Sequence, residues 1–167
     1  MFFVNVWTTL IKYYPFFLEG IKNTLIIAVF TVLFGTILGT LMAMARLSPF
    51  QPLKWFAVAY IEFFRGTPLM VQLMFIFYGL PMIGVTFPDI PSIENFQRFA
   101  AGIVAMSLNS CAYVSEIIRS GIQAVDSGQM EAARSLGFKK AQGMRFVVLP
   151  QAIRNILPAL GNEFITV

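Results

Sequence analysis

The chain contains the heptapeptide Glu131-Ala132-Ala133-Arg134-Ser135-Leu136-Gly137, and Leu149-Pro150 follows it. This segment lies in the most basic part of the sequence, because residues 116–154 hold six Lys and Arg against three acids. Asp126 or Ser127 can cap a short helix at its start, and Gly137 can end that helix in the left-handed conformation. The pattern predicts a short, capped, amphipathic helix outside the apolar part of the chain, of a kind that inserts into a partner's groove.

The composition is that of a membrane protein. Hydrophobic residues make up 57% of the chain and charged residues 12%, with a mean hydropathy of +0.74. A soluble domain carries about 25% charged residues. The net charge of +4 does not indicate nucleic-acid binding, because the basic residues fall in loops between apolar runs and there set orientation in a membrane. We therefore expect an all-α integral membrane protein without a nucleic-acid partner.

Several kinds of chemistry are excluded by residue type. Cys111 is the only cysteine and lies in an apolar run, so no internal disulfide can form. The chain has no histidine, no cluster typical of a metal site, and no Gly-x-x-x-x-Gly-Lys-Ser/Thr phosphate loop. We expect neither enzyme activity nor a bound cofactor or metal in this chain. If ATP drives the protein, another chain hydrolyses it.

The apolar runs predict a transmembrane region over residues 21–122, with spans near 23–45, 55–80 and 99–118. Residues 1–20 are rich in aromatic residues but interrupted by charges and Pro15, and they predict an interfacial N-terminal segment. In the first span, Gly35, Gly39 and Ala43 recur every four residues and form a small-residue stripe that favours close helix packing.

The second span reaches the length needed to cross a bilayer only if it includes charged residues. The apolar run that starts at Pro68 is too short to cross a bilayer, so the helix is expected to begin near Trp55. It then carries Glu62 and Arg65 in its inner half and is kinked at Pro68. This charged pair is either a pathway element or an interfacial anchor.

The third span carries a polar stripe that includes Asn109, Tyr113 and Glu116. Polar groups on a membrane helix are costly against lipid, so the stripe is expected to face protein or water. It forms either the wall of a substrate path or, through Asn109, a set of interhelical hydrogen bonds. The candidate residues of a substrate path are Asn109, Tyr113, Glu116, Glu62, Arg65, Thr67 and Gln72.

The distribution of Lys and Arg predicts the topology. The proposed inner regions hold nine of them, namely Arg46, Lys54, Arg65 and the six between residues 116 and 154, while the outer regions hold Lys12, Lys22 and Arg98. Because inner loops carry the excess of positive charge, the N-terminus is expected outside and residues 123–150 in the cytoplasm.

The spacing of Glu131-Ala132-Ala133, Gly137 and Val147-x-Leu149-Pro150 resembles the EAA loop of membrane subunits of ABC importers. The resemblance extends from about Gly20 to the end of the chain. Further blocks resemble the branch that imports polar amino acids of the histidine, glutamine and glutamate type: Arg65-Gly66-Thr67-Pro68 with Val71-Gln72, Ala112-Tyr113-x-x-Glu116-Ile117-Ile118-Arg119, and Gly128-Gln129.

This resemblance implies a permease subunit of the type I ABC importer fold in the bacterial plasma (inner) membrane, crossing it several times. It implies two ATPase subunits that carry ATP and Mg, a second permease subunit, identical or related, and an extracytoplasmic solute-binding protein, all assembled in membrane lipid. Residues 123–150 are then the cytoplasmic EAA coupling loop. The residues expected to couple to the ATPase are Glu131, Ala132, Ala133, Ser135, Leu136, Gly137, Leu149 and Pro150.

Residues 151–167 predict an amphipathic segment with a second break at Pro158, leading toward a further span. Related subunits continue through two more spanning helices, so we expect a truncated chain with three of about five core transmembrane helices. Two alternatives remain open: a secondary transporter or channel subunit that works without an ATPase, and a truncated structural or non-functional remnant.

Overall fold

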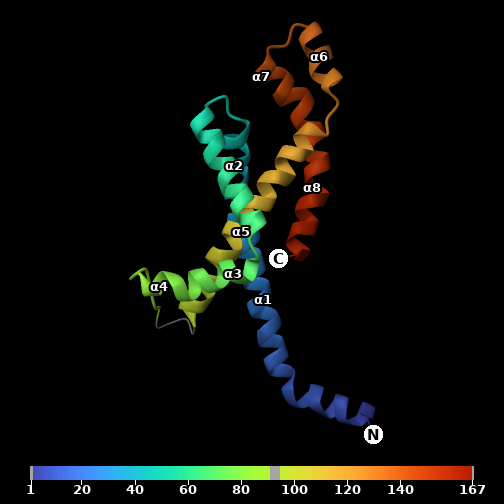
Figure 1. Ribbon diagram of the computed structural model, residues 1–167. Helices are drawn as coiled ribbons and strands as arrows, with labels where there is room; N and C mark the ends of the chain where they lie inside the picture. The colour runs from blue at the N-terminus through green and yellow to red at the C-terminus, as the bar shows by residue number, and fades with distance from the viewer. Residues whose placement is uncertain (1, 91–94, 167) are drawn as a thin grey trace.

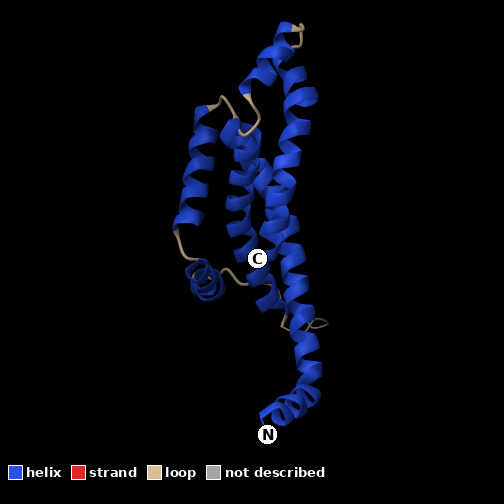
Figure 2. Ribbon diagram, turned by 90° about the vertical axis from the view of Figure 1, so that its right-hand side faces the viewer, coloured by secondary structure: helices blue, strands red, loops and turns tan. Residues whose placement is uncertain are grey.

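The computed structural model describes residues 2–90 and 95–166, and for residues 2–5 only the backbone. Every regular element among them is helical, which confirms the predicted all-α class (Figure 2). Met1 and Val167, at the ends of the predicted N- and C-terminal segments, lie outside the described residues. The elements are α1 (Phe2–Leu47), α2 (Gln51–Gly66), α3 (Leu69–Met74), the π-helical turn η1 (Phe75–Gly79), α4 (Leu80–Met82), α5 (Phe96–Gln123), α6 (Ser127–Ser135), α7 (Lys140–Gly143), the π-helical turn η2 (Met144–Val148) and α8 (Leu149–Thr166).

Helix α1 includes both the predicted interfacial segment and the first predicted span. It continues through Pro15, and the ribbon bends in its N-terminal part (Figure 1). A proline keeps a helical φ and removes one hydrogen bond, so a helix can continue through it with a bend. Residues 6–47 are long and apolar enough to cross a membrane, as is α5. The interfacial position of residues 1–20 stays a prediction.

The small-residue stripe of α1 packs against α5. A Cβ atom on Gly35 would lie 2.7 Å from the Ser110 Oγ, and one on Gly39 would lie 2.7 Å from the Val114 Cβ. Ala43, one step further along the stripe, is buried. The predicted packing role of the stripe is therefore confirmed, and it forms the most extensive helix pair in the fold.

The bend predicted at Pro68 in the second span is present, and it is a break between two helices. Helix α2 starts earlier, at Gln51, and the helices on the two sides of the break differ in direction by 103°. Thr67, the residue before the proline, is extended with φ −112° and ψ 143°, as proline demands of its predecessor. The Gln72 side chain donates to the carbonyl oxygens of Phe64 (2.9 Å) and Thr67 (3.1 Å), groups left free where α2 ends.

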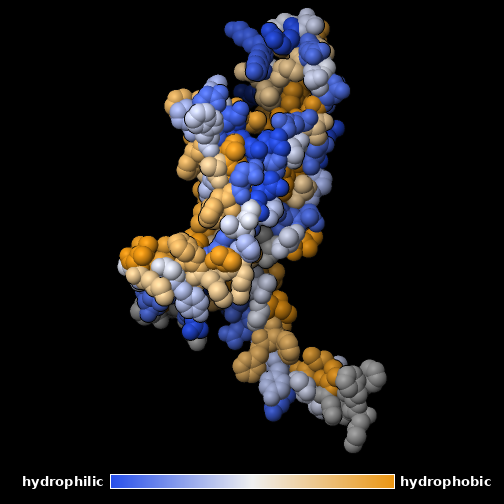
Figure 3. Space-filling view, viewed as in Figure 1, coloured by the Kyte–Doolittle hydropathy of each residue, from blue (hydrophilic) through white to orange (hydrophobic). Residues whose placement is uncertain are grey.

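The predicted second break, at Pro158, is absent, because α8 continues through that proline to Thr166. Helix α8 lies beside α5, and α6 and α7 form a hairpin beyond the ends of both (Figure 1). The turn between α1 and α2 lies toward the hairpin end of the molecule, whereas the N-terminus lies at the opposite end. Apolar residues dominate around α3 and α4, and hydrophilic residues gather in the centre of the same face and around the hairpin (Figure 3).

Candidate functional site

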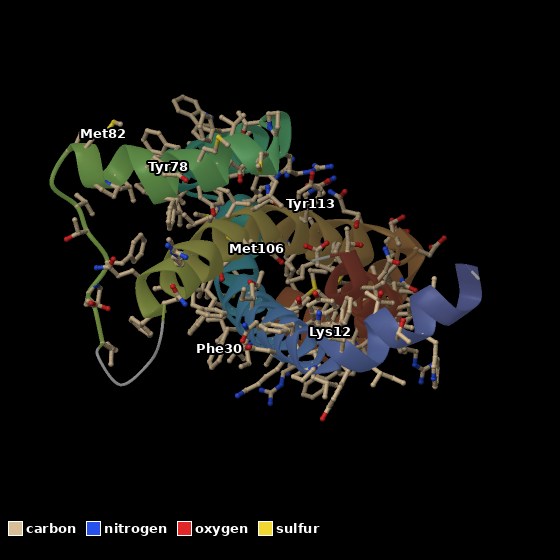
Figure 4. The ribbon with its side chains drawn as sticks, turned by 90° about the horizontal axis from the view of Figure 1, so that it is seen from below. Lys12, Phe30, Tyr78, Met82, Met106 and Tyr113 are labelled. Carbon is tan, nitrogen blue, oxygen red and sulfur yellow. The ribbon has the colours of Figure 1, made fainter. Side chains whose placement is uncertain are left out.

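A cavity of about 500 Å³ lies where the break between α2 and α3 faces α5 and the end of α8. Figure 4 shows two of its lining residues, Met106 and Tyr113, on α5, which runs between α1 and the α3–α4 segment. The chain around the cavity comes from four helices, so a change in the position of any of them alters its shape. The lining residues are Arg65, Gly66, Thr67, Pro68, Leu69, Met106, Asn109, Tyr113, Glu163 and Thr166.

The cavity carries charges of both signs. The Arg65 guanidinium lies 5.5 Å from the centre of the Tyr113 ring, within cation–π range. The Glu163 carboxylate, half-buried on α8, accepts a hydrogen bond of 3.0 Å from the Ser110 hydroxyl. Glu163 is not among the predicted site residues, although it is the only carboxylate in the amphipathic segment 151–167 and its cost in a membrane helix was a usable signal.

Asn109 makes the interhelical hydrogen bonds that were one of the two roles left open for the polar stripe, and its role in a substrate path stays a prediction. Its side-chain amide donates to the Gln72 Oε1 (3.0 Å) and to the Phe64 carbonyl (3.4 Å), which links α5 to the end of α2. It also lines the cavity. Gln72 is buried in this amide network and does not line the cavity. Its hydrogen bonds connect parts of the fold.

Glu116 lies in an ion cluster rather than at the cavity. Its carboxylate is 2.5 Å from the Arg46 Nη1 on α1 and also bonds the Arg119 guanidinium one turn along α5. This cluster ties the end of α1 to α5. Glu62 is exposed on α2, and in the described part of the chain it makes no ion pair with Arg65, whose guanidinium faces Tyr113 instead. Arg65 was expected in the inner half of the second span. It lies in the last turn of α2, at the opposite end of that helix from Gln51.

Glu116→Gln is expected to lower the stability of the protein by about 1–3 kcal/mol, because it weakens charge-assisted hydrogen bonds and leaves two guanidinium groups facing each other. The measurement is the denaturation midpoint of the detergent-extracted protein. The matched control is Glu62→Gln, an exposed carboxylate on α2, which should change stability by no more than about 0.5 kcal/mol. Equal midpoints for the two variants would show that the cluster does not hold α1 to α5.

The helix of the Glu131–Gly137 segment forms as predicted. Asp126 caps α6, because its carboxylate accepts the backbone N–H of Gly128 at 2.7 Å. Gly137 follows the helix with φ +87°, a conformation that favours glycine. The Ser135 hydroxyl donates to the Glu131 carbonyl within the helix, so it is already satisfied. The segment is therefore a rigid capped helix and not a flexible loop.

The two alanines of the segment face different ways. Ala133 is buried against α7, where a Cβ on Gly143 would lie 3.4 Å from the Ala133 Cβ. Ala132 and Glu131 are exposed, and Leu136 is 81% exposed at the end of the hairpin. The outer face of α6 thus presents a small residue, an acid and an apolar side chain together. Leu149 and Pro150 lie apart from this face, at the start of α8.

The family of binding-protein-dependent transport system inner membrane components matches residues 35–167 of this chain. The chain belongs to that family. Two of its helices are long and apolar enough to cross a membrane, or three spans form if the bent pair around Pro68 counts as one. It is therefore a multi-pass inner-membrane component of the permease type.

Relatives with assigned names agree with this family. The chain is 47% identical over 154 residues to the arginine transport system permease protein ArtQ of Bacillus subtilis, covering 91% of this chain and 66% of that protein. It is 45% identical to a putative glutamine transport system permease protein GlnP of Rickettsia felis, covering 93% of this chain and 69% of the relative. A crystal structure of an amino acid ABC transporter with histidines superposes with a TM-score of 0.86 at 50% identity, covering 95% of this chain and 70% of that one.

Proposed function

We propose that the chain is a permease subunit of an ATP-driven importer of polar amino acids, moved by a separate ATPase that grips the α6–α7 hairpin. The observation that carries the proposal is the position of the hairpin. It joins α5 to α8, and these two helices supply Asn109, Tyr113 and Glu163 to the cavity. A displacement of the hairpin is therefore passed directly to two walls of the cavity.

The outer face of α6 suits a contact with a partner protein. Ala132 allows close approach, Leu136 offers an exposed apolar anchor, and Glu131 can pair with basic or polar groups. The helix is capped at Asp126 and ended at Gly137, so little conformational entropy is lost when it binds. Of the residues expected to couple, Ala133 and Ser135 support the hairpin from within.

The cavity suits the backbone groups of a free amino acid. Arg65 can bind the α-carboxylate, because guanidinium and carboxylate groups match in geometry and charge. Glu163 can bind the α-ammonium group, and the polar residues Thr67 and Asn109 also line the cavity. The relatives named for arginine and glutamine support an amino-acid substrate.

The remaining parts of the proposal concern the assembly. The chain has no phosphate-binding loop, so ATP and Mg belong to the ATPase subunits. A second permease subunit closes the path, and a solute-binding protein delivers the substrate at the outer face. The excess of positive residues around the hairpin supports a cytoplasmic position for the hairpin and an outer position for the N-terminus.

Glu131→Lys is expected to reduce substrate-stimulated ATP hydrolysis by about tenfold, equivalent to about 1.4 kcal/mol of lost coupling, because it reverses a charge on the docking face. The measurement uses the assembled complex in proteoliposomes, with the amount of permease in the membrane determined in parallel. The matched control is Asp89→Lys, which reverses an exposed acid in the segment between α4 and α5. Unchanged hydrolysis in Glu131→Lys, or uptake without nucleotide, would contradict the proposed function.

A further inference from the structure

The connection from the hairpin into α8 contains a turn that is wider than an α-helical turn. In η2 the N–H of Leu149 donates to the carbonyl oxygen of Met144, five residues earlier, instead of four. Helices α7, η2 and α8 otherwise follow one another without interruption from Lys140 to Thr166. The wide turn therefore holds one residue more than a regular helix needs over the same length.

The buried residues on this helix reveal what the extra residue does. They are Gly143, Val148, Ala152 and Ile156, so the steps between them are five, four and four residues. In a regular α-helix five residues turn by about 500°, which places the fifth residue about 140° away from the first. The single step of five crosses η2. The π-helical turn thus keeps all four residues in one buried stripe.

The two ends of this stripe contact different parts of the protein. At the hairpin end, a Cβ on Gly143 would lie 2.8 Å from the Met130 Sδ of α6. At the other end, a Cβ on Gly121 of α5 would lie 2.4 Å from the Ile156 Cγ1. Both glycines lie where an added side chain would collide with its neighbour, so a rotation of one end against the other would disturb close packing at both ends. Packing therefore fixes the rotation of α8 relative to the hairpin.

Pro150 follows the wide turn, and like the packing it favours the wide turn over a regular α-helical turn. A proline ring in a regular helix collides with the carbonyl of the residue four positions earlier, here Phe146, which lies inside η2. The same order occurs at η1, where the Leu80 N–H donates to the Phe75 carbonyl ahead of Pro81. Pro158 lies in a regular part of α8, so a proline alone does not create such a turn. At η2 the packing selects the wide turn and the proline disfavours the regular one.

We propose that Leu149-Pro150 is a positioning element, which holds the π-helical turn and so sets the rotational register between the coupling hairpin and α8. This inference rests on the proposed function, in which the hairpin moves α8. It assigns Leu149 and Pro150 no contact with the ATPase. The rotational register decides which side of α8 faces the cavity. It therefore decides whether Glu163 lines the cavity.

The test removes the proline alone, and then the proline together with the extra residue. Pro150→Ala lets the turn close as a regular helix, which rotates α8, and it should lower coupling several-fold. Deleting the exposed Phe146 in the same variant removes the extra residue, returns the stripe to regular steps of four, and should restore coupling. The matched control deletes Ile153, an exposed residue in the regular part of α8, together with Pro150→Ala, and should restore nothing.

Two readouts separate register from transport. The first is formation of a disulfide by the double substitution Gly121→Cys and Ile156→Cys in a Cys111→Ala background, because close Cβ atoms are required for the bond. The second is substrate-stimulated ATP hydrolysis of the full complex. We expect both to fall several-fold in Pro150→Ala and to recover when Phe146 is also deleted.

The outcomes are distinct. If the Phe146 deletion lowers cross-linking or coupling further, the positioning role is overturned and a direct contact of Pro150 or Phe146 is favoured. If cross-linking falls and recovers as described but substrate never stimulates hydrolysis, even with the unmodified chain, the register inference stands and the proposed function fails.

Discussion

Gly39→Leu is expected to destabilise the membrane region strongly and to lower the yield of folded protein. At this position a Cβ would lie 2.7 Å from the Val114 Cβ and 2.9 Å from the Cys111 carbonyl oxygen. A backbone oxygen in a helix cannot move aside as a side chain can, so α1 and α5 must separate along their whole contact. Overpacking of this kind costs about 3 kcal/mol at the upper end of its usual range, a large part of the 5–15 kcal/mol that stabilises a typical protein.

The measurement is the yield of monodisperse protein after detergent extraction, together with its denaturation midpoint. The matched control is Gly20→Leu on the same helix, where no atom lies within 4 Å of the added Cβ. This control should fold as the unmodified chain does. Equal yields and midpoints for both variants would show that the α1–α5 contact does not determine stability.

Arg65→Glu is expected to lower amino-acid uptake by about 10- to 100-fold, because it removes a charge-assisted hydrogen bond to the substrate carboxylate, worth about 1.5–3 kcal/mol. The change also places two carboxylates, at positions 65 and 163, in one cavity of about 500 Å³. Both repel the α-carboxylate of a substrate. Uptake of labelled arginine and glutamine into proteoliposomes that contain the complete transporter measures the effect.

The matched control for this prediction is Lys54→Glu, which reverses an exposed charge on the same helix outside the cavity lining. It should leave uptake within a few-fold of the unmodified protein. Arg65→Lys should be intermediate, since lysine keeps the charge but loses the planar pair of donors. Full uptake by Arg65→Glu would remove the cavity from the substrate path.

Local features of the fold were predictable from the sequence because they depend on neighbouring residues. The cap at Asp126 and the left-handed Gly137 follow from rules for helix ends. The stripe that includes Gly35 and Gly39 follows from helical periodicity, and the structure shows the close contact that it predicts. The coupling and substrate-path roles of the candidate residues remain predictions.

The bend at Pro68 was predicted, but its size and the continuation of α8 through Pro158 were not, because the effect of a proline depends on the contacts around it. Pro68 divides a helix, Pro158 lies within one, and Pro150 follows a π-helical turn. At Pro68 a side chain replaces the lost helical hydrogen bonds, because Gln72 donates to the backbone carbonyl groups left free at the end of α2. Glu163 became a site candidate only when α8 was seen against Ser110 on α5.

The buried amide network of Gln72 has a consequence for how the cavity changes shape. Gln72 bonds the end of α2, and Asn109 bonds Gln72, so the elbow formed by α2 and α3 at Pro68 is joined to α5 by hydrogen bonds between amide and carbonyl groups. We expect that side of the cavity to be the stiffer wall. Helix α8 continues directly from the hairpin and reaches the same cavity through Glu163. We expect opening to be one-sided, with α8 sliding past a stationary elbow.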